Sequence, residues 1–338
     1  MTPATTLPLA PLTLRGVTFA PALFCAPMAG ITHSAFRRLL ADFGGYGALW
    51  TEMLCARNIL AEDTRNSPWL KRRPQEGKVI YQLLVVEAAR LPETLERLAP
   101  LQPDGIDLNM ACPAPSIRRQ RGGANLFEDA DRLREIVRVL RRNFSGPLTV
   151  KTRLGRQTPD WREKLRDRLH LLEDEGVDAV TIHPRFAEEM LKRSARHALY
   201  AGLAAETRLP IIANGDIISR DEACSHAAQL APAAGLMIGR IAAAQPWFFA
   251  KWHDPALTVD YLAVWNRLCD YIAEDFADTK VLGQIRIIAP YFARNFLFAH
   301  TFFAQVQSAP DVATARARAA EFLSRAPEPA TQVTVSGI

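Results

Sequence analysis

Short apolar runs alternate with amphipathic stretches over the first 250 residues of the chain. Eight runs of mainly apolar residues occur, at 23–28, 48–53, 79–85, 105–110, 148–152, 179–183, 210–214 and 235–238. Segments with helical periodicity follow them, at 34–43, 87–98, 129–143, 160–175, 198–207 and 220–229, with another beginning near residue 241. Continuous apolar strands that alternate with helices indicate a parallel sheet covered by helices. Eight such units in about 225 residues predict an α/β fold, a closed (β/α)8 TIM barrel, rather than a doubly wound sheet.

The pattern changes beyond residue 255. Residues 257–277, 281–298, 300–307 and 311–325 are helical by periodicity. Pro290 predicts a break or kink in the second of these helices. We therefore expect a barrel domain over 1–250 and a small C-terminal all-α helical domain over 251–338. Residues 13–20 are expected to form a strand or hairpin ahead of the barrel, and the tail from Ala326 is expected to be loose.

Polar or cationic side chains follow almost every predicted barrel strand. The functional groups of TIM barrels gather at the carboxyl ends of the strands, so these side chains are candidate site residues. They are Pro27 and Met28, Glu52 and Met53, Gln82, Asn109 with Cys112, Lys151 with Arg153, His183 with Arg185, Asn214 with Asp216, and Gly239 with Arg240. Solvation alone does not explain this pattern, because the strands themselves are apolar.

Cys112 is a candidate reactive group. It follows a predicted strand and precedes a proline-stiffened, arginine-rich loop that contains Gly122 and Gly123. A lone thiol beside cations and glycine-rich backbone is typical of a reactive cysteine. A small buried hydrophobic residue is the alternative, and this segment by itself favours neither.

Two glycine-bearing turns follow the last two predicted strands, at Asn214-Gly215-Asp216 and Gly239-Arg240. In TIM barrels the loops after strands seven and eight commonly bind phosphate, and glycine lets the backbone approach an anion closely. The first turn alone is equally consistent with a helix N-cap. The two turns together favour a phosphate site.

Lys151 and His183 end neighbouring predicted strands and are expected to face the barrel mouth. A buried lysine needs an anionic or electron-rich partner. A histidine at such a position can instead be a satisfied core residue. We favour contact with a ligand for both side chains.

The basic balance of the chain is consistent with a polyanionic partner. The net charge is +5 over 338 residues, and 34 of the 41 basic residues are arginine. The arginine fork suits phosphate and base stacking better than the lysine ammonium. A compositional bias of the genome would produce the same excess.

Cysteine usage and hydropathy restrict the other possibilities. The five cysteines, at 25, 55, 112, 224 and 269, include no CxxC pair. They predict neither disulfides nor a metal site, and they favour a reducing cytoplasm. No apolar run reaches 18 residues and the N-terminus lacks a signal-peptide pattern, so we expect a cytoplasmic protein without membrane association.

Eight motifs in collinear order over residues 20–250 resemble the tRNA-dihydrouridine synthase family. They are APMAGITHSAFR at 26–37, TEM at 51–53, QLL at 82–84, DLNMACP at 107–113, KTRLG at 151–155, HPR at 183–185, ANGDI at 213–217 and MIGR at 237–240. The resemblance implies an FMN-dependent barrel oxidoreductase that reduces the C5=C6 bond of particular uridines in tRNA, with NADPH as reductant. It also implies that the C-terminal helices contact tRNA. We expect a monomer with no stable protein partner.

The resemblance also implies roles for individual residues. Cys112 matches the family's general acid, which protonates uracil C5 while the flavin delivers hydride to C6. Cofactor contacts are implied for ten residues, namely Pro27, Met28, Gln82, Asn109, Lys151, His183, Asn214, Asp216, Gly239 and Arg240. Asn109 would contact either the flavin or the target uracil. Arg153 and Arg185 match basic residues at the mouth, where the flipped base and its phosphates would lie.

The chain departs from the family pattern at three positions. Ala111 stands where glycine usually precedes the cysteine, Pro184 replaces the glycine of HGR, and Asn125 stands where serine is frequent. Two alternatives remain open. One is an FMN barrel that reduces a small free pyrimidine or enone, and the other is a tRNA-binding protein with a vestigial flavin site. Salt-dependent RNA binding would argue against the first, and uridine reduction against the second.

Overall fold

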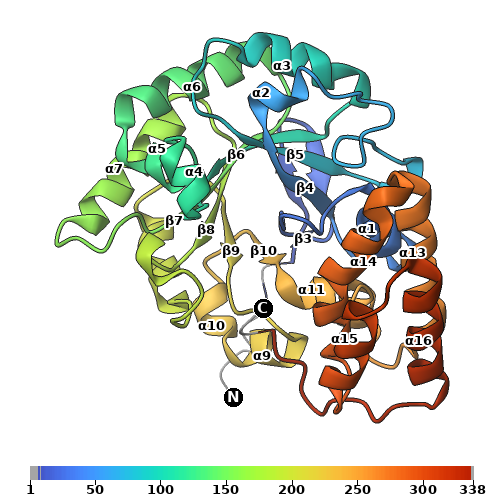
Figure 1. The fold of residues 1–338 in the computed structure, drawn as a ribbon. Helices are drawn as coiled ribbons and strands as arrows, with labels where there is room; N and C mark the ends of the chain where they lie inside the picture. Colours follow the sequence, from blue (N-terminus) through green and yellow to red (C-terminus); the bar gives the residue numbers. More distant parts are fainter. Residues whose placement is uncertain (1–6, 8, 336–338) are drawn as a thin grey trace.

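The computed structural model describes residue 7 and residues 9–335, apart from the side chain of Arg118. Within these residues eight parallel strands close into a barrel in the order β10-β3-β4-β5-β6-β7-β8-β9 (Figure 1). The barrel strands are β3 (Leu23–Cys25), β4 (Ala48–Cys55), β5 (Val79–Leu84), β6 (Gly105–Met110), β7 (Leu148–Arg153), β8 (Ala179–His183), β9 (Ile211–Asn214) and β10 (Gly235–Ile238). The predicted TIM barrel is confirmed, and each predicted apolar run coincides with one of these strands.

Side chains alternate between the inside and the outside of the barrel. On β6, Ile106, Leu108 and Met110 belong to the apolar core shared with the surrounding helices. Asp107 and Asn109 occupy the alternate positions and hydrogen-bond to side chains of the neighbouring barrel strands. Because strand side chains alternate with a period of two, one set of residues packs outward while the other builds the interior.

An antiparallel hairpin closes one end of the barrel, opposite the carboxyl ends of the strands. It consists of β1 (Leu12–Leu14) and β2 (Val17–Phe19), as the sequence predicted for this region. Leu14 and Phe19 join a separate apolar cluster with Phe24 and Trp50 of the barrel strands. The Phe19 and Phe24 rings lie 6.1 Å apart, and the Phe24 and Trp50 rings 5.4 Å apart. The floor of the barrel is therefore filled with side chains, and its other end carries the polar groups.

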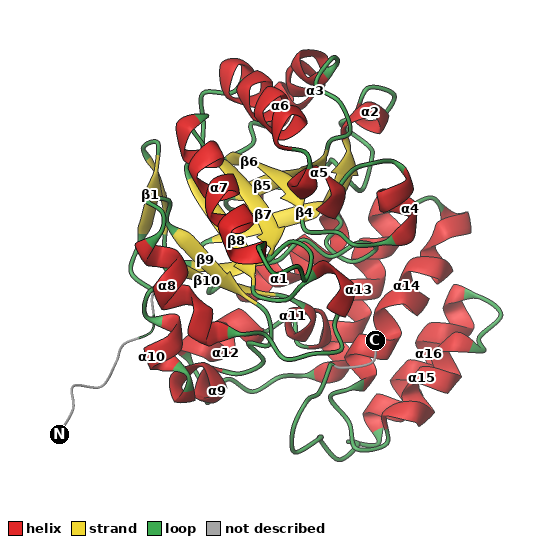
Figure 2. Ribbon diagram, turned by 90° about the vertical axis from the view of Figure 1, so that its left-hand side faces the viewer, coloured by secondary structure: helices red, strands yellow, loops and turns green. Residues whose placement is uncertain are grey.

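Helices surround the barrel on its outer side (Figure 2). They are α1 (Ser34–Phe43), α2 (Ala56–Ile59), α3 (Leu91–Leu98), α4 (Pro115–Arg119), α5 (Ala124–Glu128), α6 (Ala130–Asn143), α7 (Trp161–Asp174), α8 (Tyr200–Ala205), α9 (Arg220–Ser225), α10 (Ala227–Leu230), α11 (Arg240–Ala244) and α12 (Phe248–His253). The predicted helix over 87–98 begins only at Leu91, because Pro92 lacks an N–H group and is accommodated in the first turn. The predicted helix over 220–229 is two short helices that meet at His226.

Four further helices pack beside the barrel, next to α1 and α11 (Figure 1). They are α13 (Tyr261–Asp275), α14 (Asp278–Ala293), α15 (Ala299–Gln307) and α16 (Val312–Ser324). Pro290 lies inside α14 near its end, so the helix runs through it for three more residues. The proposed boundary at 250/251 falls within α12 and stays a prediction. None of the helices in the described residues is long and apolar enough to cross a membrane.

Ion pairs join the barrel to these helices. Arg38 of α1 binds Glu274 at 2.7 Å, and the buried carboxylate of Asp275 accepts from Lys71 at 3.0 Å and from Arg73 at 2.6 Å. The aromatic core is also shared, since the Trp247 ring lies 5.4 Å from Tyr261 of α13 and 6.2 Å from Phe292 of α14. The C-terminal helices are thus fixed to one side of the barrel.

Candidate active site

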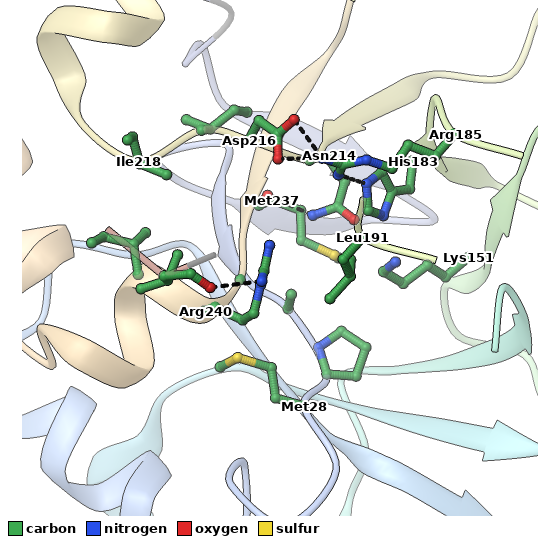
Figure 3. A pocket seen from close by; sticks show the side chains of 17 residues that line it. Met28, Lys151, His183, Arg185, Leu191, Asn214, Asp216, Ile218, Met237 and Arg240 are labelled. Atoms are coloured by element: carbon green, nitrogen blue, oxygen red, sulfur yellow. Dashed lines mark hydrogen bonds and ion pairs between the residues drawn. The ribbon is translucent and has the colours of Figure 1, made fainter. Parts of the chain in front are cut away.

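A cavity opens at the carboxyl ends of the barrel strands (Figure 3). Nine of the thirteen residues predicted from the sequence line it: Pro27, Met28, Lys151, His183, Arg185, Asn214, Asp216, Gly239 and Arg240. The other four are Gln82, Asn109, Cys112 and Arg153. Strand pairing places Asn109 opposite Lys151, and Arg153 opposite His183. Asn109 also hydrogen-bonds to the Gln82 side chain and to the N–H of Cys112, so this second group stands at the same end of the barrel. The roles of all thirteen residues stay predictions.

The two glycine-bearing turns meet in this cavity. Gly215 has a φ of +108°, and a Cβ atom there would lie 2.6 Å from Cδ2 of His183, so only glycine fits. At Gly239 a Cβ would meet only Ala26, at 4.0 Å, which leaves open space above the backbone. Arg240 is half-buried beside this space, and its guanidinium donates to the carbonyl of Val335 at 2.7 Å. The cavity therefore combines accessible backbone with a cation at the position predicted for phosphate.

Arg185 is held inside the mouth by two neighbouring side chains, the carboxylate of Asp216 and the imidazole of His183. Its guanidinium donates to both carboxylate oxygens of Asp216, at 2.7 and 2.6 Å, and lies 2.6 Å from Nε2 of His183 (Figure 3). Arginine has no acceptor, so Nε2 of His183 must accept and its ring proton must lie on Nδ1. Burial, and then the cations of Lys151 and Arg153, hold the pKa of His183 well below 6.5. His183 is therefore a neutral hydrogen-bonding group with one defined tautomer.

Lys151 is a buried cation directed into the cavity (Figure 3). Burial lowers its pKa to about 8, and the neighbouring Arg153 acts in the same direction. In the described part of the chain no carboxylate forms an ion pair with it; the charge of Asp107 raises the pKa but only partly offsets the shift. A buried ammonium group without an ion-pair partner is a candidate for contact with an anionic ligand, and this role of Lys151 stays a prediction.

Arg153 is also buried, but its contacts differ from those expected of a free basic residue at the rim. Its guanidinium donates to the carbonyls of Met190 at 2.7 Å and Phe186 at 3.3 Å. Burial, and then the nearby Arg185, lower its pKa to about 10. These carbonyls hold the loop after β8 against the mouth, so Arg153 also has a structural task.

The Cys112 loop is fixed by hydrogen bonds to its backbone. Oδ1 of Asn109 accepts from the backbone N–H groups of Ala111 at 3.1 Å and Cys112 at 3.0 Å. The carbonyl of Cys112 accepts from Ala124, and Gly123 has a φ of +57° where a Cβ would lie 2.6 Å from that carbonyl. Gly123 is therefore required for the close approach of the two loop segments. Cys112 is half-buried.

Sequence patterns did not identify every residue at the mouth. Leu191 and Val335 line the cavity from distant loops, and no local signal in the sequence announces either contact. Glu52, a candidate from the same strand-end pattern, lines a different pocket; it accepts from the N–H of Gly30 at 2.8 Å, and burial raises its pKa to about 7. Pro184, which replaces a glycine of the family pattern, keeps its carbonyl in a hydrogen bond with the N–H of Arg196.

Comparison with solved structures identifies the class of fold. The old yellow enzyme from Trypanosoma cruzi aligns with a TM-score of 0.55 at 10% identity, over 76% of this chain and 93% of that chain. Morphinone reductase aligns with a TM-score of 0.54 at 11% identity, over 76% and 92%. At this level of identity the likeness shows a shared barrel fold.

Comparison of sequences identifies the family. The family model described as dihydrouridine synthase matches residues 24–323. A probable tRNA-dihydrouridine synthase of Helicobacter pylori strain J99 is 31% identical over 260 residues, 75% of each chain. The tRNA-dihydrouridine synthase B of Vibrio vulnificus is 30% identical over 240 residues, 68% of this chain and 70% of that protein. The chain belongs to the dihydrouridine synthase family, a family of oxidoreductases.

Proposed function

We propose that the protein is an FMN-dependent tRNA-dihydrouridine synthase that uses NADPH as reductant and Cys112 as general acid. The observation that carries the proposal is the cavity that joins Lys151, His183 and Arg240 at one end of the barrel. The names of its relatives, which describe tRNA-dihydrouridine synthases, support the substrate class.

The residues present fit a flavin mononucleotide. The open backbone at Gly239 and the Arg240 guanidinium suit a phosphate group, and charge-assisted hydrogen bonds of this kind are the strong ones. The Lys151 ammonium suits the electron-rich edge of an isoalloxazine ring. Pro27 and Met28 supply apolar lining for its face. When bound, the flavin would supply the hydride that uracil C6 receives, after taking two electrons from NADPH.

The protein's own part in the reaction is to position the base and to supply a proton. The target uridine must leave the folded RNA to reach the mouth. Buried arginines and Lys151 make this mouth cationic, which favours the approach of a polyanion. The protonated Cys112 thiol donates its proton to C5, so the hydride and the proton together saturate the C5=C6 bond.

The test of this function is direct. Purified protein should release FMN on heating and should form dihydrouridine in an unmodified tRNA transcript when NADPH is added, as read by nucleoside mass spectrometry. Binding to tRNA should weaken steeply with salt because phosphate contacts release counterions. Flavin reduction by NADPH without any dihydrouridine, in protein that binds tRNA, would overturn the proposal. Reduction of free uracil but not of tRNA would indicate the small-molecule alternative.

Replacing Arg240 by alanine is expected to weaken FMN binding about 10- to 100-fold, since a hydrogen bond to a charged group is worth about 1.5–3 kcal/mol. Fluorescence titration of the apoprotein with FMN measures the change. Arg240 also holds the carbonyl of Val335, so the matched control is a chain shortened after residue 333, which removes that contact and keeps the guanidinium. Equal losses in both variants would assign the effect to the tail and not to a phosphate.

The affinity of the apoprotein for FMN is expected to fall as the pH rises above about 8. The pKa of Lys151 is lowered to about 8, so the ammonium is present below that pH and is lost above it. The Lys151→Met variant should bind more weakly below pH 8 and show no such decline. Titrations from pH 6.5 to pH 9.5 (roughly one and a half units on either side of the lowered pKa) would measure this. An unchanged pH profile in the variant would contradict the role of Lys151.

A further inference from the structure

A directed chain of hydrogen bonds runs from the barrel interior to the Cys112 loop. It begins at Asp107, a fully buried carboxylate on β6. One oxygen of Asp107 accepts from the Thr149 hydroxyl at 2.5 Å, and the other accepts from Nε2 of Gln82 at 2.7 Å. An ionised carboxylate can only accept, so the Gln82 amide must turn its nitrogen toward Asp107.

The orientation of the Gln82 amide fixes the orientation of the Asn109 amide. With its nitrogen on Asp107, Gln82 turns Oε1 toward Asn109, which donates from Nδ2 at 2.8 Å. Oδ1 of Asn109 is then free to accept from the backbone N–H groups of Ala111 and Cys112. These N–H groups can only donate, so the far end of the chain demands the same orientation that Asp107 imposes. A flip of either amide would bring donor against donor or acceptor against acceptor.

We propose that Asp107 is a positioning residue for Cys112: it orients the Gln82 and Asn109 amides and thereby holds the Cys112 loop where the thiol can act. The catalytic part of this statement rests on the proposed function, whereas the positioning part concerns the loop alone. Burial raises the pKa of Asp107 to about 6, with the Gln82 and Thr149 hydrogen bonds opposing the shift. The carboxylate is therefore still ionised at neutral pH, as the chain requires.

Two carboxylates placed in contact should break the chain. Gln82→Glu puts an acceptor-only side chain against Asp107, so the pair must separate or take up a proton. Adding Asp107→Asn restores every contact: Asn at 107 still accepts from Thr149 and now donates to the Glu at 82, whose second oxygen accepts from Asn109. The double variant thus keeps the net charge of the wild type and the orientation of Asn109. Rescue of this kind is expected only if the direction of the amides matters.

The experiment measures the alkylation rate of Cys112 in the full-length protein at neutral pH, by peptide mass spectrometry with iodoacetamide. Cys224, which is exposed on α9, serves as the reference in every sample. We expect Gln82→Glu and Asp107→Leu to change the ratio of Cys112 to Cys224 labelling about tenfold, as loss of one net hydrogen bond from the closed loop implies. The double variant Gln82→Glu with Asp107→Asn should return the ratio to the wild-type value.

Thr149→Val is the matched control, because it removes the other hydrogen bond of Asp107 without touching the amides. Since that bond lowers the pKa of Asp107, this variant and a wild-type reference are labelled at about pH 8, where the carboxylate stays ionised. The variant should leave the labelling ratio unchanged; a change equal to that of Gln82→Glu would show that any loss of a buried hydrogen bond disturbs the loop and would overturn the proposal. Absence of rescue in a folded double variant would overturn it too. Labelling does not depend on turnover, so its result is independent of whether Cys112 is the general acid. An active Cys112→Ala enzyme would contradict the catalytic role of the loop but not the hydrogen-bond chain that positions it.

Discussion

Replacing Cys112 by alanine should leave the cofactor bound and reduce dihydrouridine formation by about 10²- to 10⁴-fold, the range that a positioned general acid contributes. The loop that carries the thiol is ordered by Asn109 and by Ala124, and neither contact uses the sulfur atom. Removing the sulfur therefore removes a proton donor without removing a structural bond. Cys112 is only half-buried, in contrast to the buried Cys25 and Cys269.

The measurement separates chemistry from binding. Single-turnover formation of dihydrouridine is followed in wild type and variant at saturating tRNA, together with flavin content by absorbance. Cys224→Ala is the matched control, since that thiol is exposed on α9 away from the cavity, and it should react at the wild-type rate. Wild-type turnover by the Cys112→Ala enzyme would mean that another group protonates C5.

Deleting residues 256–338 should prevent the barrel from folding, rather than yield a flavin-binding barrel that has lost RNA affinity. The Trp247 and Phe249 side chains are fully buried, and the apolar core that contains them continues into α13 and α14. Burying one large apolar side chain contributes about 1.5–3 kcal/mol. Exposure of several at once would exceed the net stability of a typical domain, roughly 5–15 kcal/mol.

The deletion would also leave charges without partners. Asp275 of α13 binds Lys71 and Arg73, and Glu274 binds Arg38. Solubility, near-ultraviolet circular dichroism and thermal melting of the shortened chain would test the expectation. A soluble product with a cooperative transition close to that of the full-length protein would contradict it. It would also support the two-domain division of the sequence at residues 250/251.

The barrel was predictable from sequence because each strand is visible as a local run of apolar residues. Residues that a barrel strand buries against the surrounding helices are mainly apolar, so runs such as 105–110 and 179–183 could be placed without knowledge of their neighbours. The candidate site followed from the same pattern, since polar residues at strand ends must share one rim. The short helices α4 and α5 were missed because they lie in a segment of prolines and glycines that reads as a loop.

Contacts between distant residues were not predictable in this way. The carbonyl of Val335 reaches Arg240 across 95 positions of the sequence, and the tail that carries it was expected to be loose. Residues 328–330 also hydrogen-bond to the backbone of Asn295 and Leu297. Asp107 stood within the DLNMACP motif, but nothing in that string shows that its carboxylate meets Gln82 from the neighbouring strand. Which residues meet in such contacts is determined by the three-dimensional fold, when the strands close into a barrel.

The hairpin at the floor of the barrel has a kinetic consequence. Within the described residues, Leu14 and Phe19 fill one end of the barrel with apolar side chains, and the cavity lies at the polar rim of the other end. Under the proposed function, a nicotinamide and an extruded nucleotide would both approach the flavin from this rim. The enzyme would then alternate between two half-reactions. The reductant would transfer its electrons and dissociate before the RNA substrate binds and is reduced. Each substrate would compete with the other for the same barrel mouth, so an excess of either would slow the catalytic cycle.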